Sequence, residues 1–408
     1  MANNNNKDKC NVPNLRFPEF SGEWEMSSIG EQFELYSGNT PSRMNKNQFD
    51  GSINWITSGE LKEHYISDTK EKISEEAAKN NSLKLLPVGT FVIAIYGLEA
   101  NGVRGTCSIT TRESTISQAC MAFTSKMDIQ NEFLYSWYKK HGNIIGIKYA
   151  QGTKQQNLSY DIIERFNISY PCMEEQKKLI RFISLIDQRI ATQNKIIEKL
   201  QSLIKGLNDN IHKGIKGETV CFSDLGEAYS GLSGKGGDDF GYGEPFITYM
   251  NVYQNTYISE KDYELVQIAP NEKQNSVQYG DALFTLSSET PEEVGIGAVY
   301  LGNTQKLYLN SFCFGIHFYD ERVLPQYLAH FISSSSFRRA IYPLAQGSTR
   351  FNLQKNDFMK MKFLLPSLEK QGHIANTLDA LHCRLANEKS LTEQYILLKK
   401  YLLSLMFI

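Results

Sequence analysis

The stretch PCMEEQKKLI at residues 171–180 has a second version far downstream, PSLEKQGHIA at residues 366–375. Both contain the phrase Pro-x-x-Glu-x-Gln, and the two copies lie 195 residues apart. The same offset relates AQGTKQQNL at 150–158 to AQGSTRFNL at 345–353. Matches at one fixed offset on both sides of the phrase indicate an internal repeat.

Each copy of the phrase opens a long run of regularly spaced apolar residues. Between Leu179 and Ile211 the spacing alternates between four and three, with one polar interruption at Gln193. This 3.5-residue period is typical of a coiled-coil seam. The second run extends from Ile374 to Met406 and has Glu388 at the place of Gln193. Since each seam needs a partner, we expect the two helices to pair with each other in antiparallel orientation.

The region before each helix has the short β-rich runs and glycine-rich or polar turns of a mixed α/β domain. The runs at 53–57, 90–95, 107–111 and 119–124, followed by a helix-like segment at 131–141, correspond in order to 246–252, 282–286, 297–301, 312–318 and 325–337. Two short echoes support this pairing. Ile-Gly-Glu at 29–31 corresponds to Leu-Gly-Glu at 225–227, and Tyr-Ile-Ser occurs at 65–67 and 257–259.

These patterns predict an α/β (α+β) chain with two pseudo-repeated domains joined by two long antiparallel coiled-coil helices. The predicted order is a flexible tail at 1–12, a first domain at 13–171, a first helix at 172–214, a linker at 215–220, a second domain at 221–366 and a second helix at 367–408.

Composition limits the class of protein. With 408 residues, 41% hydrophobic and 22% charged, the chain is long enough for two or three globular domains. Its seven cysteines include no Cys-x-x-Cys, which favours reduced, buried thiols and argues against a structural zinc site. The net charge of −2 argues against indiscriminate coating of nucleic acid, although it leaves room for a local basic face. With no signal peptide or membrane span in the sequence, we expect a cytoplasmic protein.

Motifs of known catalytic chemistry are missing from the sequence. It contains no Walker-type phosphate loop, no Asn/Asp-Pro-Pro-Tyr/Phe run and no His-Glu-x-x-His. Glu174 and Glu369 recur in the repeat, but their place in a first helical turn favours a role in capping the helix. We therefore predict no catalytic residues and no metal site.

The repeated architecture and its best-matching motifs lead to a family. RFPEF at 16–20 with the following Trp24, the paired AQGTKQQNL and AQGSTRFNL, and the paired helix openings PCMEEQ and PSLEKQ resemble the specificity subunit of type I restriction–modification enzymes. The resemblance covers about 13–408. One departure is Lys370, where the first copy has Glu175.

The resemblance implies a function that the residues alone do not show. Each globular domain would be a target recognition domain that reads one half of a bipartite site in double-stranded DNA. The helices would set the gap between half-sites and dock two methylation subunits. Those partners would bring S-adenosylmethionine, and separate restriction (motor) subunits would use ATP and Mg²⁺. The chain itself would hold no cofactor and would catalyse nothing.

Base edges in the major groove are read by hydrogen-bonding side chains on well-fixed loops. The candidate DNA-binding residues are Thr40, Ser42, Arg43, Arg104, Lys154, Gln155, Gln156, Asn157, Lys235, Tyr249, Asn251, Ser348, Thr349, Arg350 and Asn352. Asn157 and Asn352 are identical in the repeat, which suggests that they hold the loop or a phosphate. We expect base reading from the positions that differ, Gln155 against Arg350 and Lys154 against Thr349.

Other interpretations of the sequence stay open. The candidate loops could be ordinary polar surface. The chain could be a coiled-coil scaffold whose globular domains bind proteins, or a self-contained nuclease or methyltransferase with an unrecognised site. The half-sites, the spacer length and the choice between restriction and methylation alone are not encoded in any motif.

Overall fold

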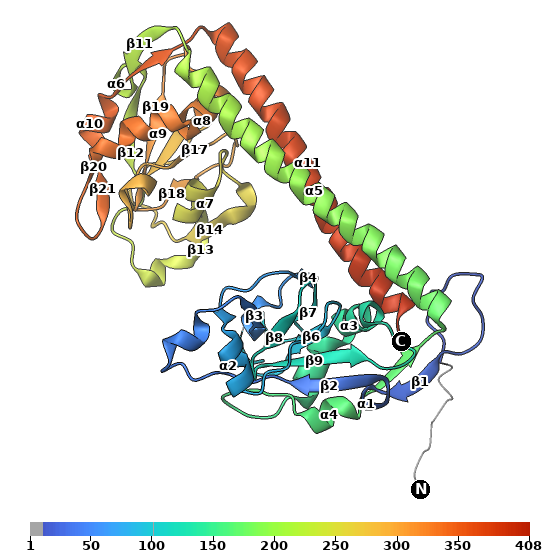
Figure 1. Cartoon of the computed structure of the whole chain (residues 1–408). Helices are drawn as coiled ribbons and strands as arrows, with labels where there is room; N and C mark the ends of the chain where they lie inside the picture. The colour runs from blue at the N-terminus through green and yellow to red at the C-terminus, as the bar shows by residue number, and fades with distance from the viewer. Residues whose placement is uncertain (1–10, 101) are drawn as a thin grey trace. The chain divides into compact units, whose positions relative to one another are not determined.

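A computed structural model describes residues 11–100 and 102–408 of the chain (Figure 1). The chain divides into two compact units, Met1–Gln193 with Leu391–Ile408, and Asn194–Ser390. Most of the predicted tail, residues 1–10, lies outside the described residues. Asn11, the first described residue of the predicted tail, is already part of the fold, because its carbonyl accepts a hydrogen bond from the Trp24 amide at 2.8 Å. The predicted domain boundaries remain predictions.

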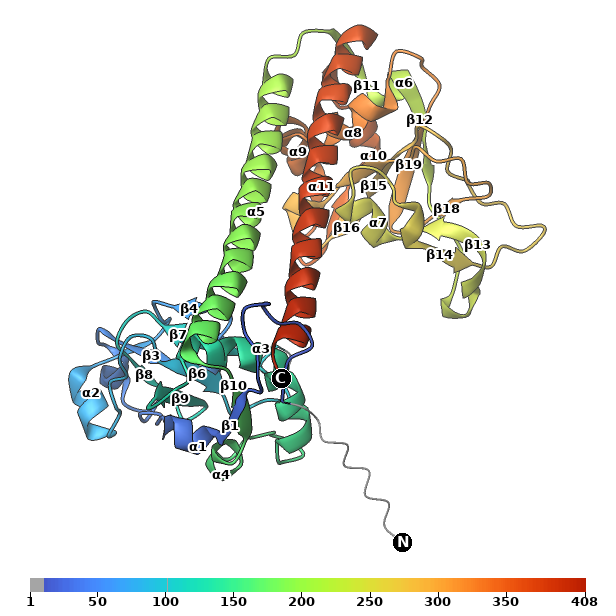
Figure 2. The same cartoon turned by 90° about the vertical axis from the view of Figure 1, so that its right-hand side faces the viewer.

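Two helices are much longer than the rest, α5 (Met173–Lys213) and α11 (Leu368–Met406). In the first unit the beginning of α5 and the end of α11 lie side by side (Figures 1 and 2), and Lys399 donates to Asp187 at 2.5 Å. In the second unit the end of α5 packs with the beginning of α11, since Leu207 shares a hydrophobic cluster with Leu378. The order of these contacts is antiparallel, which confirms the predicted helix pair.

The first unit is built on a five-stranded sheet with strand order β2-β9-β6-β7-β4. A smaller sheet, β5-β3-β8, and the antiparallel pair β1-β10 complete it. The strands are β1 (Glu25–Ser28), β2 (Phe33–Ser37), β3 (Ile53–Ile56), β4 (Tyr65–Ile66), β5 (Lys72–Ile73), β6 (Phe91–Ala94), β7 (Cys107–Thr110), β8 (Ser114–Ile116), β9 (Cys120–Ser125) and β10 (Asn167–Tyr170). The helices are α1 (Ile29–Gln32), α2 (Glu75–Asn80), α3 (Asn131–Tyr149) and α4 (Tyr160–Glu164).

The second unit repeats this plan with strand order β12-β19-β15-β17 in its main sheet. The remaining strands form β14-β13-β18, β16-β21-β20 and β11-β22. The strands are β11 (Glu218–Cys221), β12 (Gly226–Ser230), β13 (Phe240–Ile247), β14 (Tyr263–Val266), β15 (Ala282–Thr285), β16 (Ser287–Ser288), β17 (Gly297–Val299), β18 (Tyr308–Leu309), β19 (Cys313–Phe318), β20 (Ala345–Gln346), β21 (Phe351–Leu353) and β22 (Lys362–Leu365). The helices are α6 (Phe222–Leu225), α7 (Tyr249–Gln254), α8 (Pro325–Ser333), α9 (Ser335–Ile341) and α10 (Lys355–Met359).

The two units show which of the short sequence echoes are structural. Tyr65 pairs in parallel with Ile109 on β7, and Tyr257 pairs in parallel with Val299 on β17, the matching strand. The Tyr-Ile-Ser echo is therefore confirmed. The other echo is wrong, because Ile29-Gly-Glu lies inside α1, whereas Gly226 already begins strand β12. The short helix equivalent to α1 is α6, which begins at Phe222.

Each long helix begins in the core of one unit. Leu179 and Ile183 of α5 are each 2% exposed. They belong to the same hydrophobic cluster as the buried strands β6 and β9. Ile374 and Leu378, the equivalent residues of α11, occupy the same place in the second core. Burial of two aliphatic side chains contributes roughly 3–6 kcal/mol. The first turns of each helix are thus part of a globular core as well as of the coiled coil.

The departure from the repeat at Lys370 has a structural cause. In the first unit Glu175 is 1% exposed and accepts two hydrogen bonds from the guanidinium of Arg16, at 2.8 and 2.7 Å. Lys370 is exposed to solvent at the matching position of α11. A buried carboxylate is stable only with such a partner. The difference between the two copies therefore follows from the N-terminal segment that carries Arg16.

Candidate nucleic-acid interface

The repeated AQG motif forms a tight loop in the first unit. Gln151 and Asn157 exchange two backbone hydrogen bonds, of 2.8 and 2.9 Å, and Leu158 donates to the carbonyl of Ile95, the residue directly after β6, at 2.9 Å. Gly152 has a φ of +107°, and a Cβ there would lie 2.0 Å from the carbonyl oxygen of Gln155. Only glycine tolerates this turn.

The second unit contains the same loop at the matching residues. Gln346 pairs with Asn352 across strands β20 and β21, and Leu353 donates to the carbonyl of Leu286 at 2.8 Å. Gly347 has a φ of +149°, and its Cβ would lie 2.0 Å from the carbonyl of Arg350. The backbones of Asn157 and Asn352 therefore close the two loops at equivalent positions, and the role expected for their side chains stays a prediction.

The tips of the two loops face solvent. The side chains of Lys154, Gln155, Ser348, Thr349 and Arg350 are exposed, and within the described part of the chain none of the five makes a side-chain hydrogen bond or ion pair. They are held on a backbone that is fixed on both sides. Free polar side chains on a fixed loop are what base or phosphate contact requires.

In the first unit a hydrogen bond between Arg104 and Gln156 stabilises the loop. Arg104 donates to Gln156 at 2.7 Å, and its stem lies against Gly146 of α3. The amide of Gln156 donates to Glu99 at 2.7 Å, which lowers the pKa of that carboxylate. Arg104 and Gln156 thus hold the loop in place, and Lys154 and Gln155 are the free members of the predicted set.

In the second unit the loop stands beside a hollow of about 300 Å³. Two predicted residues, Tyr249 and Arg350, line it together with Tyr253, Phe312 and Glu289, which the sequence analysis missed. The rings of Tyr249 and Tyr253 stack at 6.0 Å, and the Arg350 guanidinium lies 5.9 Å from the centre of the Phe312 ring. A signal for the missed acid, Glu289, existed in SSET at 287–290, a polar run directly after a buried strand.

Other predicted residues have structural roles. Arg43 forms a two-bond ion pair with Glu71, lowers the pKa of that carboxylate and lies over the rings of Phe49 and Trp55. Lys235 is 8% exposed and donates to Glu272 at 2.5 Å, which lowers the pKa of Glu272 to about 2.

The remaining predicted residues are a buried asparagine, Asn251, and two residues of a surface loop, Thr40 and Ser42. Asn251 is 2% exposed inside α7, a helix where a strand was predicted, and it bonds Ser259 through both its amide nitrogen and oxygen. Thr40 and Ser42 sit on the surface loop before Arg43. The structure therefore leaves the two AQG loops and the Tyr249 hollow as the strongest part of the candidate interface.

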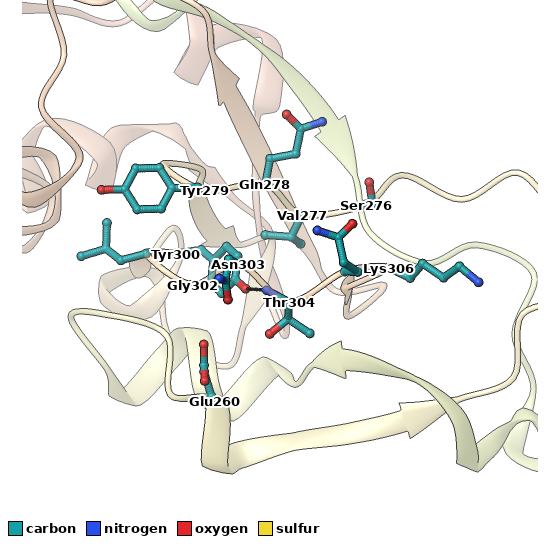
Figure 3. A pocket seen from close by; sticks show the side chains of 12 residues that line it. Glu260, Ser276, Val277, Gln278, Tyr279, Tyr300, Gly302, Asn303, Thr304 and Lys306 are labelled. Carbon is teal, nitrogen blue, oxygen red and sulfur yellow. Dashed lines mark hydrogen bonds between the residues drawn. The ribbon is translucent and has the colours of Figure 1, made fainter.

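A larger hollow of about 800 Å³ lies elsewhere in the second unit and contains none of the predicted residues (Figure 3). Its wall carries Glu260, Tyr300 and Lys306, and the Thr304 amide donates to the Tyr300 hydroxyl at 2.8 Å (Figure 3). Lys306 pairs with Glu244 outside it at 3.2 Å. We assign no function to this hollow.

Two features of the described residues bear on metal and membrane binding, the grouping of metal-ligating side chains and the length and polarity of the helices. No three His, Cys, Asp or Glu side chains there come together in a way that could hold a metal ion. None of the helices in the described ranges is long and apolar enough to span a membrane.

Comparison with known proteins decides the family. A profile described as the type I restriction modification DNA specificity domain matches residues 21–202 and 217–394, once in each half of the chain. The chain belongs to this family. Membership confirms the predicted resemblance and places the chain with specificity subunits, not with the catalytic subunits of type I enzymes.

Individual relatives agree with the family. The chain is 29% identical over 185 residues to the specificity subunit of the type I restriction enzyme MjaIX from Methanocaldococcus jannaschii, a match that spans 44% of this chain and 42% of that subunit. It is 21% identical to the MjaVIII specificity subunit of the same organism, over 96% of this chain and 93% of that one.

A solved structure shows the same fold. The crystal structure of the type I restriction–modification S subunit from M. genitalium superposes with a TM-score of 0.54 at 13% identity, and the match covers 97% of this chain and 99% of that one. Two α/β domains with paired long helices are therefore the architecture of a known specificity subunit.

Proposed function

We propose that this chain selects the DNA sequence on which a type I restriction–modification complex acts. Each globular domain reads one half of a bipartite site through its AQG loop, at 151–157 and at 346–352. The observation that carries the proposal is the duplicated loop. Its ends are paired in the same way in both units, whereas the free side chains at its tip differ.

The difference at the tips has a direct chemical meaning. Gln155 presents an amide with one donor and one acceptor end, which suits adenine, whereas Arg350 presents a fork of donors, which suits guanine. Two domains that share one loop structure but carry different side chains at its tip are suited to an asymmetric DNA site.

The helix pair supports the second part of the proposal, that two methylation subunits dock on the chain. Leu397, Leu398 and Tyr401 on α11 are 65%, 46% and 61% exposed. Apolar side chains grouped on a solvent-facing helix mark a protein interface. The partners would supply S-adenosylmethionine, ATP and Mg²⁺, while this chain supplies sequence choice and no chemistry.

Two substitutions test whether the domains read independently. Gln155→Ala and Arg350→Ala are each made in the full chain, co-expressed with its methylation subunit, and methylated sites are mapped. We expect each variant to relax one half-site and to leave the other intact. Relaxation of both half-sites by either variant would contradict the proposal.

A further inference from the structure

The hollow beside the second AQG loop has two opposite charges on its rim that do not pair with each other. Glu289 and Arg350 both line it, yet within the described ranges neither makes an ion pair or a side-chain hydrogen bond, and both are exposed. Neighbouring opposite charges on a protein surface readily pair, so two that stay apart are available to an external ligand.

The other acid of the hollow is not available in this way. Glu293 accepts a hydrogen bond from the Tyr253 hydroxyl at 2.6 Å and another from the Ser288 hydroxyl at 3.0 Å. Both carboxylate oxygens are engaged, and they fix the ring of Tyr253 as part of the wall. Glu289 is therefore the one acid of the hollow that the described residues leave without a partner.

The strands next to the two charged residues are paired with each other. Ser287 pairs through its backbone with Asn352, and Ser288 pairs with Phe351, so the strand before Glu289 and the strand after Arg350 form one small sheet. The Tyr249 hydroxyl donates to the carbonyl of Ser287 at 2.9 Å. The backbone next to Glu289 is thus held against the backbone next to Arg350 before any ligand arrives.

A carboxylate on a DNA-reading surface needs a specific reason, because it repels phosphates. In the major groove a carboxylate can accept a hydrogen bond only from the exocyclic amino group of cytosine or adenine. An arginine is best satisfied by the two acceptors of guanine, O6 and N7. One base pair, G·C, offers both groups on the same edge.

We infer that Arg350 and Glu289 together read one G·C pair in the half-site of the second domain, with Arg350 on the guanine and Glu289 on the cytosine. The inference rests on the proposed function. It goes beyond it by naming the base pair and by adding Glu289 as a specificity-determining residue.

The first unit provides the internal contrast. Its loop has Gln155 in place of Arg350, and an acid beside that loop, Glu99, is already engaged by the amide of Gln156 at 2.7 Å. The same pair of free charges is therefore not formed there by the described residues, and the assignment to G·C applies to the second domain alone.

The test measures methylation of a duplex library by the full chain assembled with its methylation subunits. The library varies every position of both half-sites, and the variants are Arg350→Ala, Glu289→Ala and, as a matched charge control, Glu321→Gln, an exposed acid outside the hollow. Thermal unfolding of each variant confirms that it folds.

We expect both Arg350→Ala and Glu289→Ala to relax the same G·C position, each by about ten-fold in discrimination. Glu289→Ala should also raise affinity for unrelated duplexes, because a charge that repels phosphate is gone. Glu321→Gln should leave the half-site unchanged.

Two results would overturn the inference while the proposed function stands. One is an Arg350-dependent half-site with only A·T pairs, and the other is relaxation by Arg350→Ala without relaxation by Glu289→Ala at the same position. Failure of the wild-type assembly to methylate a bipartite site would instead remove the proposed function itself.

Discussion

Gln176 and Gln371, 195 residues apart, make the same set of hydrogen bonds in the two units. Gln176 donates to the carbonyls of Pro171 and Asp128 at 3.0 and 2.6 Å, and it accepts from the amide of Gln130 at 3.0 Å. Gln371 donates to the carbonyls of Pro366 and Arg322 at 2.9 and 2.7 Å, and it accepts from the amide of Leu324 at 2.8 Å.

Both glutamines are 0% exposed. Each one closes the first turn of its long helix onto the loop that precedes the domain's own helix, α3 or α8. The phrase Pro-x-x-Glu-x-Gln thus recurs because its glutamine is a buried clamp between helix and domain.

We expect Gln176→Ala and Gln371→Ala each to lower the free energy of unfolding by about 2–4 kcal/mol, since buried donors and acceptors lose their partners. Hydrogen exchange should show the loss locally, around α3 for the first variant and around α8 for the second. Gln188→Ala, on the exposed face of α5, is the control and should have little effect. Equal, uniform loosening of both units by either variant would contradict the clamp.

Acid should loosen the second unit near α8. His330 is 1% exposed and lies 2.7 Å from Asp379 of α11, and its ring stacks on His382 at 5.4 Å. Burial lowers the pKa of His330, His382 and His212. Because the unfolded chain binds these protons more readily, stability is full above about pH 6.5 and falls as the pH drops below it.

The protection of the α8 amides, measured at pH 7.5 and at pH 5.5 relative to the intrinsic exchange rate at each pH, should therefore fall more than the protection of strand β6 in the first unit. His330→Gln should reduce that difference. A pH response that is unchanged in His330→Gln would show that the buried histidine is not its source.

The exposed apolar group on α11 should be needed for assembly. Leu397→Glu with Tyr401→Glu puts two charges in a surface that we expect to be desolvated on docking, so affinity for the methylation subunit should fall at least ten-fold. Binding is measured by titration with the purified subunit, and Lys400→Glu, an exposed neighbour, serves as the charge control. Full binding by the double variant would place the docking surface elsewhere.

Helix length should set the gap in the recognised site. Removing one heptad from α5 and the facing heptad from α11 shortens the pair by roughly 10 Å at ~1.5 Å per residue. At ~3.4 Å per base pair this amounts to about three base pairs of spacer. Site mapping should return both half-sites with a shorter gap, and an unchanged gap would exclude the helices as the spacer.

The sequence predicted the parts of the fold that repeat most closely. The 3.5-residue period from Leu179 to Ile211 was enough to predict the paired helices, and Gly152 and Gly347 marked the two loops because only glycine fits their turns. The order of the strands was also readable, although the domains have diverged. Boundaries failed where a polar residue ended a strand early, as at Thr248, which caps α7.

The candidate site was harder to predict, because a sequence shows a charge without showing its partner. Lys235 and Arg43 looked available for DNA, but Glu272 and Glu71 engage them across the fold. Glu289 was not predicted, because a lone acid in a sequence gives no sign that an arginine lies near it in the fold. Its meaning depends on Arg350, which lies 61 residues away in the sequence and lines the same hollow.

The most direct test of the account is a genome-wide map of adenine methylation by single-molecule sequencing, in cells that express the methylation subunit with and without this chain. The account predicts a bipartite motif, two short half-sites separated by a gap of unspecified bases, that disappears when the chain is deleted. A continuous motif, or a map that does not change on deletion while the methylation subunit is active, would contradict it.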